Sequence, residues 1–164
     1  MRIIVFSDSH GSTGCMRAAL LDQPEADMII HLGDGEHDLE KLSDLTAGKR
    51  IVQVCGNCDL YSFLPVNEIV DVNGTRIFCT HGFKELVKHG TVQLVEKARS
   101  LNASIALYGH THQTVTRYED GLHIMNPGSI SCPKDTSSPS YGTIDIVGKN
   151  IVCNVVRMEH YRGY

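Results

Sequence analysis

Histidine, aspartate and asparagine side chains follow several short apolar stretches of this 164-residue chain. The residues concerned are Asp8, His10, Asp34, Asn57, His81, His110 and His112. Five apolar stretches end in one or two of them, and a glycine stands nearby at four of these ends. Imidazole and carboxylate groups suit divalent ions such as those of Mn, Fe, Zn or Ni. One such residue alone would be an ordinary turn residue, but five similar strand ends predict a metal site.

The apolar stretches are predicted to be β-strands, because they are short and rich in Ile, Val and Leu. The expected strands cover residues 3–6, 28–32, 51–55, 68–72, 76–80, 104–108, 114–118, 122–125, 143–147 and 151–156. Helices are expected at 15–21, 37–45 and 91–101, where capping residues or the spacing of apolar side chains favour them. Asn73-Gly74 predicts a tight hairpin turn between two strands.

The order of these elements predicts an α/β fold. Strands and helices alternate in the first half, which is typical of a parallel sheet with crossover helices. The second half is richer in strands and hairpins, so two packed sheets are favoured over one sheet of ten strands. We expect a single domain over residues 1–164, built as two packed mixed β-sheets flanked by helices, a four-layer α-β-β-α sandwich.

The metal-competent side chains follow the carboxyl ends of the strands, where ligands bind in open α/β sheets. A neighbouring glycine lets the backbone turn tightly and approach closely. We therefore expect the five strand ends to lie side by side in the sheet and to deliver their side chains into one crevice.

The composition disfavours several classes of protein. A formal net charge of −4 argues against nonspecific nucleic-acid binding, which needs a basic face. The apolar runs are strand-sized, so none is expected to span a membrane. Met1-Arg2 leads directly into a strand without a signal-peptide pattern, which makes a cytoplasmic location the expectation. The six cysteines are then expected to be reduced thiols.

Two other patterns have plainer interpretations. Cys55 and Cys58 form a C-x-x-C pair, which would suit thiol redox chemistry or half a zinc site. No second pair exists, however, and the residues that follow make a poor helix start. The remaining histidines lack the strand-end context and are expected to be structural or surface residues: His31, His37, His89, His123 and His160.

Taken in order, the polar motifs resemble those of the calcineurin-like metallophosphoesterases. They are Asp8-Ser9-His10, Gly33-Asp34, Gly56-Asn57-Cys58-Asp59, Thr80-His81-Gly82 and Gly109-His110-Thr111-His112, with Asn126-Pro127-Gly128-Ser129 as a further match. That last stretch either lines the site or forms a plain tight turn. The short length is similar to that of the small bacterial and archaeal phosphodiesterase branch. The resemblance implies a two-sheet sandwich, in agreement with the fold expected from the elements.

The resemblance also assigns metal ligands by position. The two sets, joined by the bridging carboxylate Asp34, are Asp8, His10 and His112 for a first ion and Asn57, His81 and His110 for a second. A carboxylate suits the bridging position because it has two oxygens. The implied cofactor is two divalent ions per chain, Mn²⁺ first, with Ni²⁺, Zn²⁺ or Fe²⁺ as alternatives. No cysteine occupies a ligand position, so a thiolate zinc site is not implied.

The implied activity is hydrolysis of a small phosphodiester. Two ions about 3.5–4 Å apart hold the phosphate, and a hydroxide that bridges them attacks phosphorus. Asp34, Asn57 and His81 are the implied catalytic residues. Many members of the family have a histidine directly after the motif asparagine as a candidate general acid. Here that position is Cys58, which is either an unusual proton donor to the leaving group or a packing residue.

Three alternatives stay open at this point. The fold also resembles the small scaffold subunit of the retromer coat, which binds protein partners and has lost part of the metal set. A phosphomonoesterase of the same broad family is the second, although no arginine follows Gly56-Asn57 as in phosphoprotein phosphatases. The third is a redox protein that uses Cys55 and Cys58. The sequence also leaves open whether the chain forms a homo-oligomer.

Overall fold

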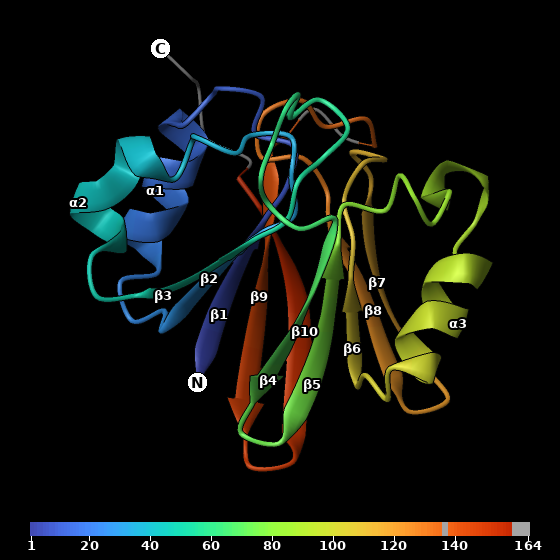
Figure 1. Ribbon diagram of the computed structural model, residues 1–164. Helices are drawn as coiled ribbons and strands as arrows, with labels where there is room; N and C mark the ends of the chain where they lie inside the picture. Colours follow the sequence, from blue (N-terminus) through green and yellow to red (C-terminus); the bar gives the residue numbers. More distant parts are fainter. Residues whose placement is uncertain (136–137, 159–164) are drawn as a thin grey trace.

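Two five-stranded mixed sheets pack face to face in the computed structural model, which describes residues 1–135 and 138–158 (Figure 1). The strands are β1 (Arg2–Phe6), β2 (Met28–His31), β3 (Arg50–Gln53), β4 (Asn67–Val72), β5 (Thr75–Thr80), β6 (Ile105–Leu107), β7 (Thr114–Glu119), β8 (Leu122–Pro127), β9 (Ser140–Val147) and β10 (Asn150–Arg157). The helices are α1 (Gly14–Asp22), α2 (Ser43–Thr46) and α3 (Val92–Ser100), with 3₁₀ turns at Glu40–Leu42 and Val87–His89. Each strand expected from the sequence is present, and the expected α/β sandwich is confirmed.

The strand order explains why the chain needs crossover helices. The first sheet runs β10-β9-β1-β2-β3, and the second runs β4-β5-β6-β8-β7. Within them, β1, β2 and β3 are parallel neighbours, as are β5, β6 and β8. Parallel neighbours need a connection that returns across the sheet. Helix α1 makes that return on the outer face of the first sheet, and α3 makes it on the opposite side of the sandwich (Figure 1).

Alternation along β1 shows how the layers are held together. Ile3 and Val5 belong to the core between the sheets, whereas Ile4 and Phe6 pack beneath α1 with Met16. Successive side chains of a strand point to opposite faces, so a strand covered on both faces is apolar throughout. Burying each such side chain stabilises the fold by about 1.5–3 kcal/mol relative to leaving it in water.

Helix α3 covers the second sheet with a narrow apolar stripe. Leu94 and Ala98 are fully buried and lie in one cluster with Phe78 and Ala106 of the sheet beneath. The four-residue spacing places both helix residues on one face. Among the described residues, no helix has the length and apolar character needed to cross a membrane.

The helix expected over residues 37–45 is wrong. The chain there forms a 3₁₀ turn and the short helix α2, with a break at Leu42, whose φ is −117°. The Asp38 carboxylate points inward and accepts hydrogen bonds from Ser9 Oγ and the Gly11 amide. The spacing of the leucines reflects burial, since Leu39 and Leu42 are both buried. The hydrogen bonds of Asp38 to Ser9 and Gly11 are tertiary contacts, and they prevail over the local preference for a continuous helix.

The expected hairpin turn at Asn73-Gly74 is confirmed. Both residues have positive φ, 50° and 82°, as a two-residue turn of type I′ requires. The polar segment expected as a loop at 131–140 is irregular in its described part, with residues 136–137 outside the described residues and β9 beginning at Ser140.

Candidate metal centre

The predicted ligands gather at one end of the sandwich rather than at the edge of one sheet. Strands β1, β2 and β3 of the first sheet lead to Asp8, His10, Asp34 and Asn57, and β5 and β6 of the second lead to the other histidines. The expectation that five strand ends lie side by side in a single sheet is therefore wrong. Each sheet contributes one wall, and the side chains meet where the two walls come together.

Left-handed backbone conformations direct most of these side chains. Five predicted ligands have positive φ: Asp8 (55°), His10 (47°), Asp34 (58°), His110 (67°) and His112 (58°). This region costs a residue with a Cβ atom about 1–2 kcal/mol, and it persists only where the surroundings enforce it. The strained turns send the side chains back over the ends of the strands, toward one another.

Asp8, His10 and His112 form the first group. The ring Nδ1 of His112 lies 2.7 Å from the Cys132 carbonyl, which can only accept, so Nδ1 carries the proton and Nε2 is free to bind. That Nε2 is 3.2 Å from Asp8 Oδ1 and 3.4 Å from His10 Nε2. Asp8 Oδ1 is the buried side-chain atom without a hydrogen-bond partner in the described part of the chain. Electron-pair donors that face one another in this way fit a cation between them.

His81, Asn57 and His110 form the second group in the same manner. Nδ1 of His81 donates to the Leu32 carbonyl at 2.7 Å, which turns Nε2 inward. Nε2 is 3.2 Å from Asn57 Oδ1 and 3.2 Å from His110 Nδ1. Burial lowers the pKa of His110 to about 4, so this ring is neutral and able to ligate at pH 7. An oxygen and two ring nitrogens again point to one place.

Asp34 lies between the two groups. Its Oδ1 accepts the Cys58 amide hydrogen at 2.8 Å, and its Oδ2 is 3.5 Å from His81 Nε2 and 3.9 Å from His10 Nε2. Burial opposes ionisation of this carboxyl, but its contacts with His81 and Cys58 outweigh burial and lower its pKa. A single ionised oxygen is thus approached from both sides, which is the arrangement a bridging ligand needs.

The carboxylates make this end of the molecule attractive to positive charge. Burial alone would lower the pKa of His81, but Asp34 and Asp8 outweigh it and raise that pKa. The Asp8 carboxylate, 3.2 Å from Nε2 of His112, likewise raises the pKa of that ring. A divalent ion would compete with a proton for Nε2 of each ring, and the Nδ1 proton of each ring would keep its bond to a backbone carbonyl.

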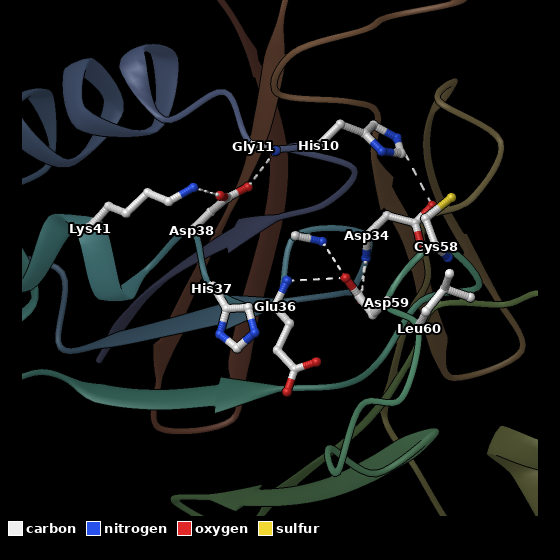
Figure 2. A pocket seen from close by; sticks show the side chains of 11 residues that line it. His10, Gly11, Asp34, Glu36, His37, Asp38, Lys41, Cys58, Asp59 and Leu60 are labelled. Carbon is white, nitrogen blue, oxygen red and sulfur yellow. Dashed lines mark hydrogen bonds and ion pairs between the residues drawn. The ribbon is translucent and has the colours of Figure 1, made fainter.

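Asp59 holds the loops that carry Asp34 and Asn57. Its two oxygens accept backbone hydrogens from Asp34 at 2.8 Å, Gly35 at 2.9 Å and Glu36 at 3.1 Å (Figure 2). They also accept the backbone hydrogen of Gly56 at 2.7 Å. The sequence pattern contained Asp59 but gave it no role. Its position two residues after a predicted ligand was the available signal, because aspartate commonly binds nearby backbone amides in turns.

We expect Asp59→Asn to lower the affinity for Mn²⁺ by about 10–100-fold, the usual cost of losing a group that orients metal ligands. Asparagine replaces one of the two accepting oxygens with an NH₂ group that cannot accept. Isothermal titration of the metal-stripped protein measures the affinity. Asp120→Asn, an exposed site in the β7–β8 turn, is the matched control and should bind normally. Unchanged affinity in Asp59→Asn would contradict the supporting role.

The stretch Asn126–Ser129 supports the backbone of the site rather than lining it. Ser129 Oγ donates to the Asp8 carbonyl at 2.7 Å, and Asn126 Nδ2 donates to the Gly109 carbonyl at 2.9 Å. Both side chains are fully buried. These bonds hold the backbone of the strained turns at Asp8 and at Gly109, the residue before His110.

His31 belongs to a buried hydrogen-bond chain under the site. Ser9 Oγ donates to Asp38 Oδ2 at 2.7 Å and lies 3.0 Å from His31 Nε2, so it accepts from that nitrogen. The other ring nitrogen of His31 accepts from the Gly33 amide at 3.2 Å. The ring is therefore neutral, and burial lowers its pKa to about 4.

We expect His31 to make the fold less stable as the pH falls from about 6.5 to 4. The unfolded ring takes up a proton near pH 6.5, whereas the folded pKa is about 4. Because the folded pKa is depressed, the contribution is fully present above pH 6.5 and is lost toward pH 4, about 3 kcal/mol in all. Over this pH range, denaturant unfolding of metal-stripped protein should show about 3 kcal/mol less loss of stability in His31→Gln than in wild type, because His110 titrates over the same range in both proteins. The exposed His37→Gln should behave like wild type, and equal losses in all three proteins would refute the assignment.

A groove of about 450 Å³ opens beside the candidate centre (Figure 2). His10, Asp34 and Cys58 line it at the centre, and His37 and Lys41 also line it. Among the described residues, the histidines that were expected to be non-ligands join none of the groups above: His31, His37, His89 and His123. His160 lies outside the described residues.

The thiol redox alternative gains no support from the structure. Cys55 and Cys58 are free, as are the other cysteines. The residues after Cys58 form turns instead of the helix that usually follows a redox pair. Burial and the nearby Asp34 raise the pKa of Cys58 to about 11, whereas a redox thiol needs a lowered pKa.

Residues 1–149 match the family model of the calcineurin-like phosphoesterase superfamily domain. The chain belongs to this superfamily. Phosphodiesterase YfcE of Escherichia coli K12 is 28% identical over 185 residues, covering 97% of this chain and 93% of that protein. A crystal structure of a predicted phosphoesterase from Streptococcus pneumoniae TIGR4 matches with a TM-score of 0.81 and 31% identity, covering 97% of this chain and 90% of that one.

A similar fold is found in Vps29, whose name does not describe a phosphoesterase. Zinc-complexed Vps29 from Entamoeba histolytica matches with a TM-score of 0.75 at 23% identity, covering 96% of this chain and 99% of that one. This likeness concerns the fold. The resemblance to calcineurin-like phosphoesterases expected from the motifs is confirmed by the family match.

Proposed function

We propose that the chain is a metal-dependent phosphodiesterase with a dinuclear centre. The observation that carries the proposal is the position of Asp34 Oδ2, 3.5 Å from His81 Nε2 and 3.9 Å from His10 Nε2. The proposed ligand sets are Asp8, His10 and His112 for one ion, Asn57, His81 and His110 for the other, and Asp34 for both. The domain is proposed to extend over residues 1–164, and its location is proposed to be cytoplasmic.

The protein residues supply position and charge. Two bound divalent ions would polarise the phosphate and supply the hydroxide that attacks phosphorus. Asp34 stays ionised, and its carboxylate lies between the two groups of ligands. His81 is oriented by its hydrogen bond to Leu32, and His112 by its bond to Cys132. The nucleophile comes from water, so no side chain becomes phosphorylated.

The donor set favours ions of intermediate hardness. Imidazole nitrogens with carboxylate and amide oxygens accept Mn²⁺, Fe²⁺, Ni²⁺ and Zn²⁺, and we propose Mn²⁺ as the activating ion. The groove beside the centre is open enough for a small phosphodiester. The E. coli relative that matches along nearly the whole chain is named a phosphodiesterase, which supports this substrate class.

We expect Cys58→Ala to change the Mn²⁺-dependent rate little. Its pKa of about 11, raised by burial and by Asp34, makes the thiol a poor proton donor to a leaving group at neutral pH. Diesters with good leaving groups should therefore be preferred. Steady-state kinetics with a nitrophenyl diester checks the expectation, and a loss above about a hundredfold would assign Cys58 an essential acid role.

A noncatalytic scaffold is the second candidate, and metal binding alone does not separate the two. Vps29, which shares the fold, is itself described in a zinc complex. Turnover is the property that distinguishes them. The filled set of ligand positions and the ionised Asp34 between the two groups favour the enzyme.

The test is hydrolysis by protein stripped of metal and then supplied with Mn²⁺, Ni²⁺, Zn²⁺ or Fe²⁺ in turn. Bis(nitrophenyl) phosphate and nitrophenyl phosphate are compared at equal concentration. Metal-restored turnover that is faster on the diester supports the proposal. Faster turnover of the monoester would indicate a phosphomonoesterase, and no turnover with any ion would favour the scaffold.

A further inference from the structure

Cys58 lies closer to the candidate centre than its sequence position suggested. Its sulfur, a ring nitrogen of His10 and a carboxylate oxygen of Asp34 all lie within 4.8 Å of one another. Figure 2 shows the sulfur beside the Asp34 carboxylate, with His10 directed at the same carboxylate. The expectation that no cysteine occupies a ligand position came from the motifs alone, whereas the geometry brings the Cys58 sulfur among candidate ligand atoms.

Two hydrogen bonds hold the sulfur on the His10 side of the site. The Cys58 amide donates to Asp34 Oδ1 at 2.8 Å, which fixes the residue against the carboxylate. Asn57 Nδ2 donates to Cys58 Sγ at 3.3 Å, while Oδ1 of the same side chain faces His81 at 3.2 Å. The Asn57 amide therefore has its oxygen toward one group of ligands and its N–H toward the sulfur.

We propose that Cys58 is an additional, thiolate ligand for the ion held by His10 and Asp34 when that ion binds sulfur well, as Zn²⁺ and Co²⁺ do. The inference rests on the proposed metal centre. The S–H bond breaks, its proton passes to solvent, and a sulfur–metal bond forms, with no change of oxidation state. Bond lengths of about 2.3 Å to sulfur and about 2.0 Å to nitrogen or oxygen keep ligand atoms within about 4 Å of each other, so a small side-chain movement suffices.

The consequence is a difference between ions. Sulfur is a soft ligand that strengthens Zn²⁺ and Co²⁺ binding and contributes little to the harder Mn²⁺. We therefore expect Cys58→Ser to lower the affinity for Zn²⁺ by about tenfold or more, with a smaller change for Mn²⁺.

The experiment is a Co²⁺ titration of metal-stripped protein followed by near-ultraviolet absorption. A sulfur-to-cobalt charge-transfer band should grow in wild type and be absent in Cys58→Ser. Cys132→Ser is the matched control, because Cys132 is also exposed and contacts His112 through its backbone carbonyl. It should keep the band. X-ray absorption of the Zn²⁺ form should show a sulfur neighbour at about 2.3 Å that disappears in Cys58→Ser.

The outcomes separate this inference from the proposed function. Cobalt binding without a charge-transfer band, or a band that survives in Cys58→Ser, would overturn thiolate ligation while Mn²⁺-dependent hydrolysis of the diester remains intact. Failure to bind Co²⁺ together with failure of Mn²⁺ to restore hydrolysis would overturn both. A band that depends on Cys58 but not on Cys132 supports the inference.

Discussion

Replacing Asp34 by asparagine should abolish metal-dependent hydrolysis, with a loss of more than about a hundredfold, beyond the usual cost of losing a group that only orients ligands. Asp34 Oδ1 accepts the Cys58 amide hydrogen, so the oxygen of an asparagine would take that place. Its NH₂ group would then stand between His81 and His10, where Oδ2 now lies. An uncharged N–H donor there repels cations instead of holding them.

The measurement for Asp34→Asn combines initial rates at saturating Mn²⁺ with the amount of metal bound per chain. Asp44→Asn is a suitable control, because that carboxylate belongs to α2, is exposed and pairs with Arg17 of α1. It should keep both activity and metal. Wild-type turnover in Asp34→Asn would contradict the proposed role of Asp34 as a ligand that bridges two ions.

Gly56→Ala should cause the second large effect, through the shape of the loop rather than through charge. A Cβ atom at Gly56 would overlap the Asp34 carboxylate and its backbone nitrogen. The Asp34 nitrogen is already fixed by Asp59, so the loop cannot shift without losing that bond. We expect a loss of stability of about 3 kcal/mol, at the upper end of overpacking costs, together with loss of Mn²⁺ binding.

Thermal and denaturant unfolding measure the stability of Gly56→Ala, and titration measures its metal affinity. Gly121→Ala is the comparison, because Gly121 has φ of 83° but open space around its Cβ position. It should cost about 1–2 kcal/mol from backbone strain and leave metal binding unchanged. Normal metal binding in Gly56→Ala would show that the close packing at this glycine does not position Asp34.

Short apolar strands were predictable because their composition is dictated by burial on both faces, as in β1 with Ile3, Val5, Ile4 and Phe6. The division of the strand ends between two sheets was not predictable from the same pattern. Both sheets use parallel strands that end in polar turns, and no local signal states which strands are neighbours. The helix expected over 37–45 failed for a related reason, since contacts of Asp38 with distant residues decide that segment.

The candidate site shows the same division between local and long-range information. The residues that meet there follow strands and glycines, so their spacing in the sequence was enough to select them. The groups that hold them in place were harder to recognise. Ser129 supports Asp8 across 121 positions of sequence, and His31 looked like an ordinary strand residue. The proximity of the Cys58 sulfur to His10 likewise appears only when the two loops are brought together.

The central claim is a centre of two metal ions that act together on a phosphodiester. Its most direct test is a Mn²⁺ titration of metal-stripped protein, with bound metal and hydrolysis of the diester measured on the same samples. The account predicts that hydrolysis reaches its plateau when two ions are bound per chain. Full activity with one bound ion, or two bound ions without hydrolysis, would contradict it.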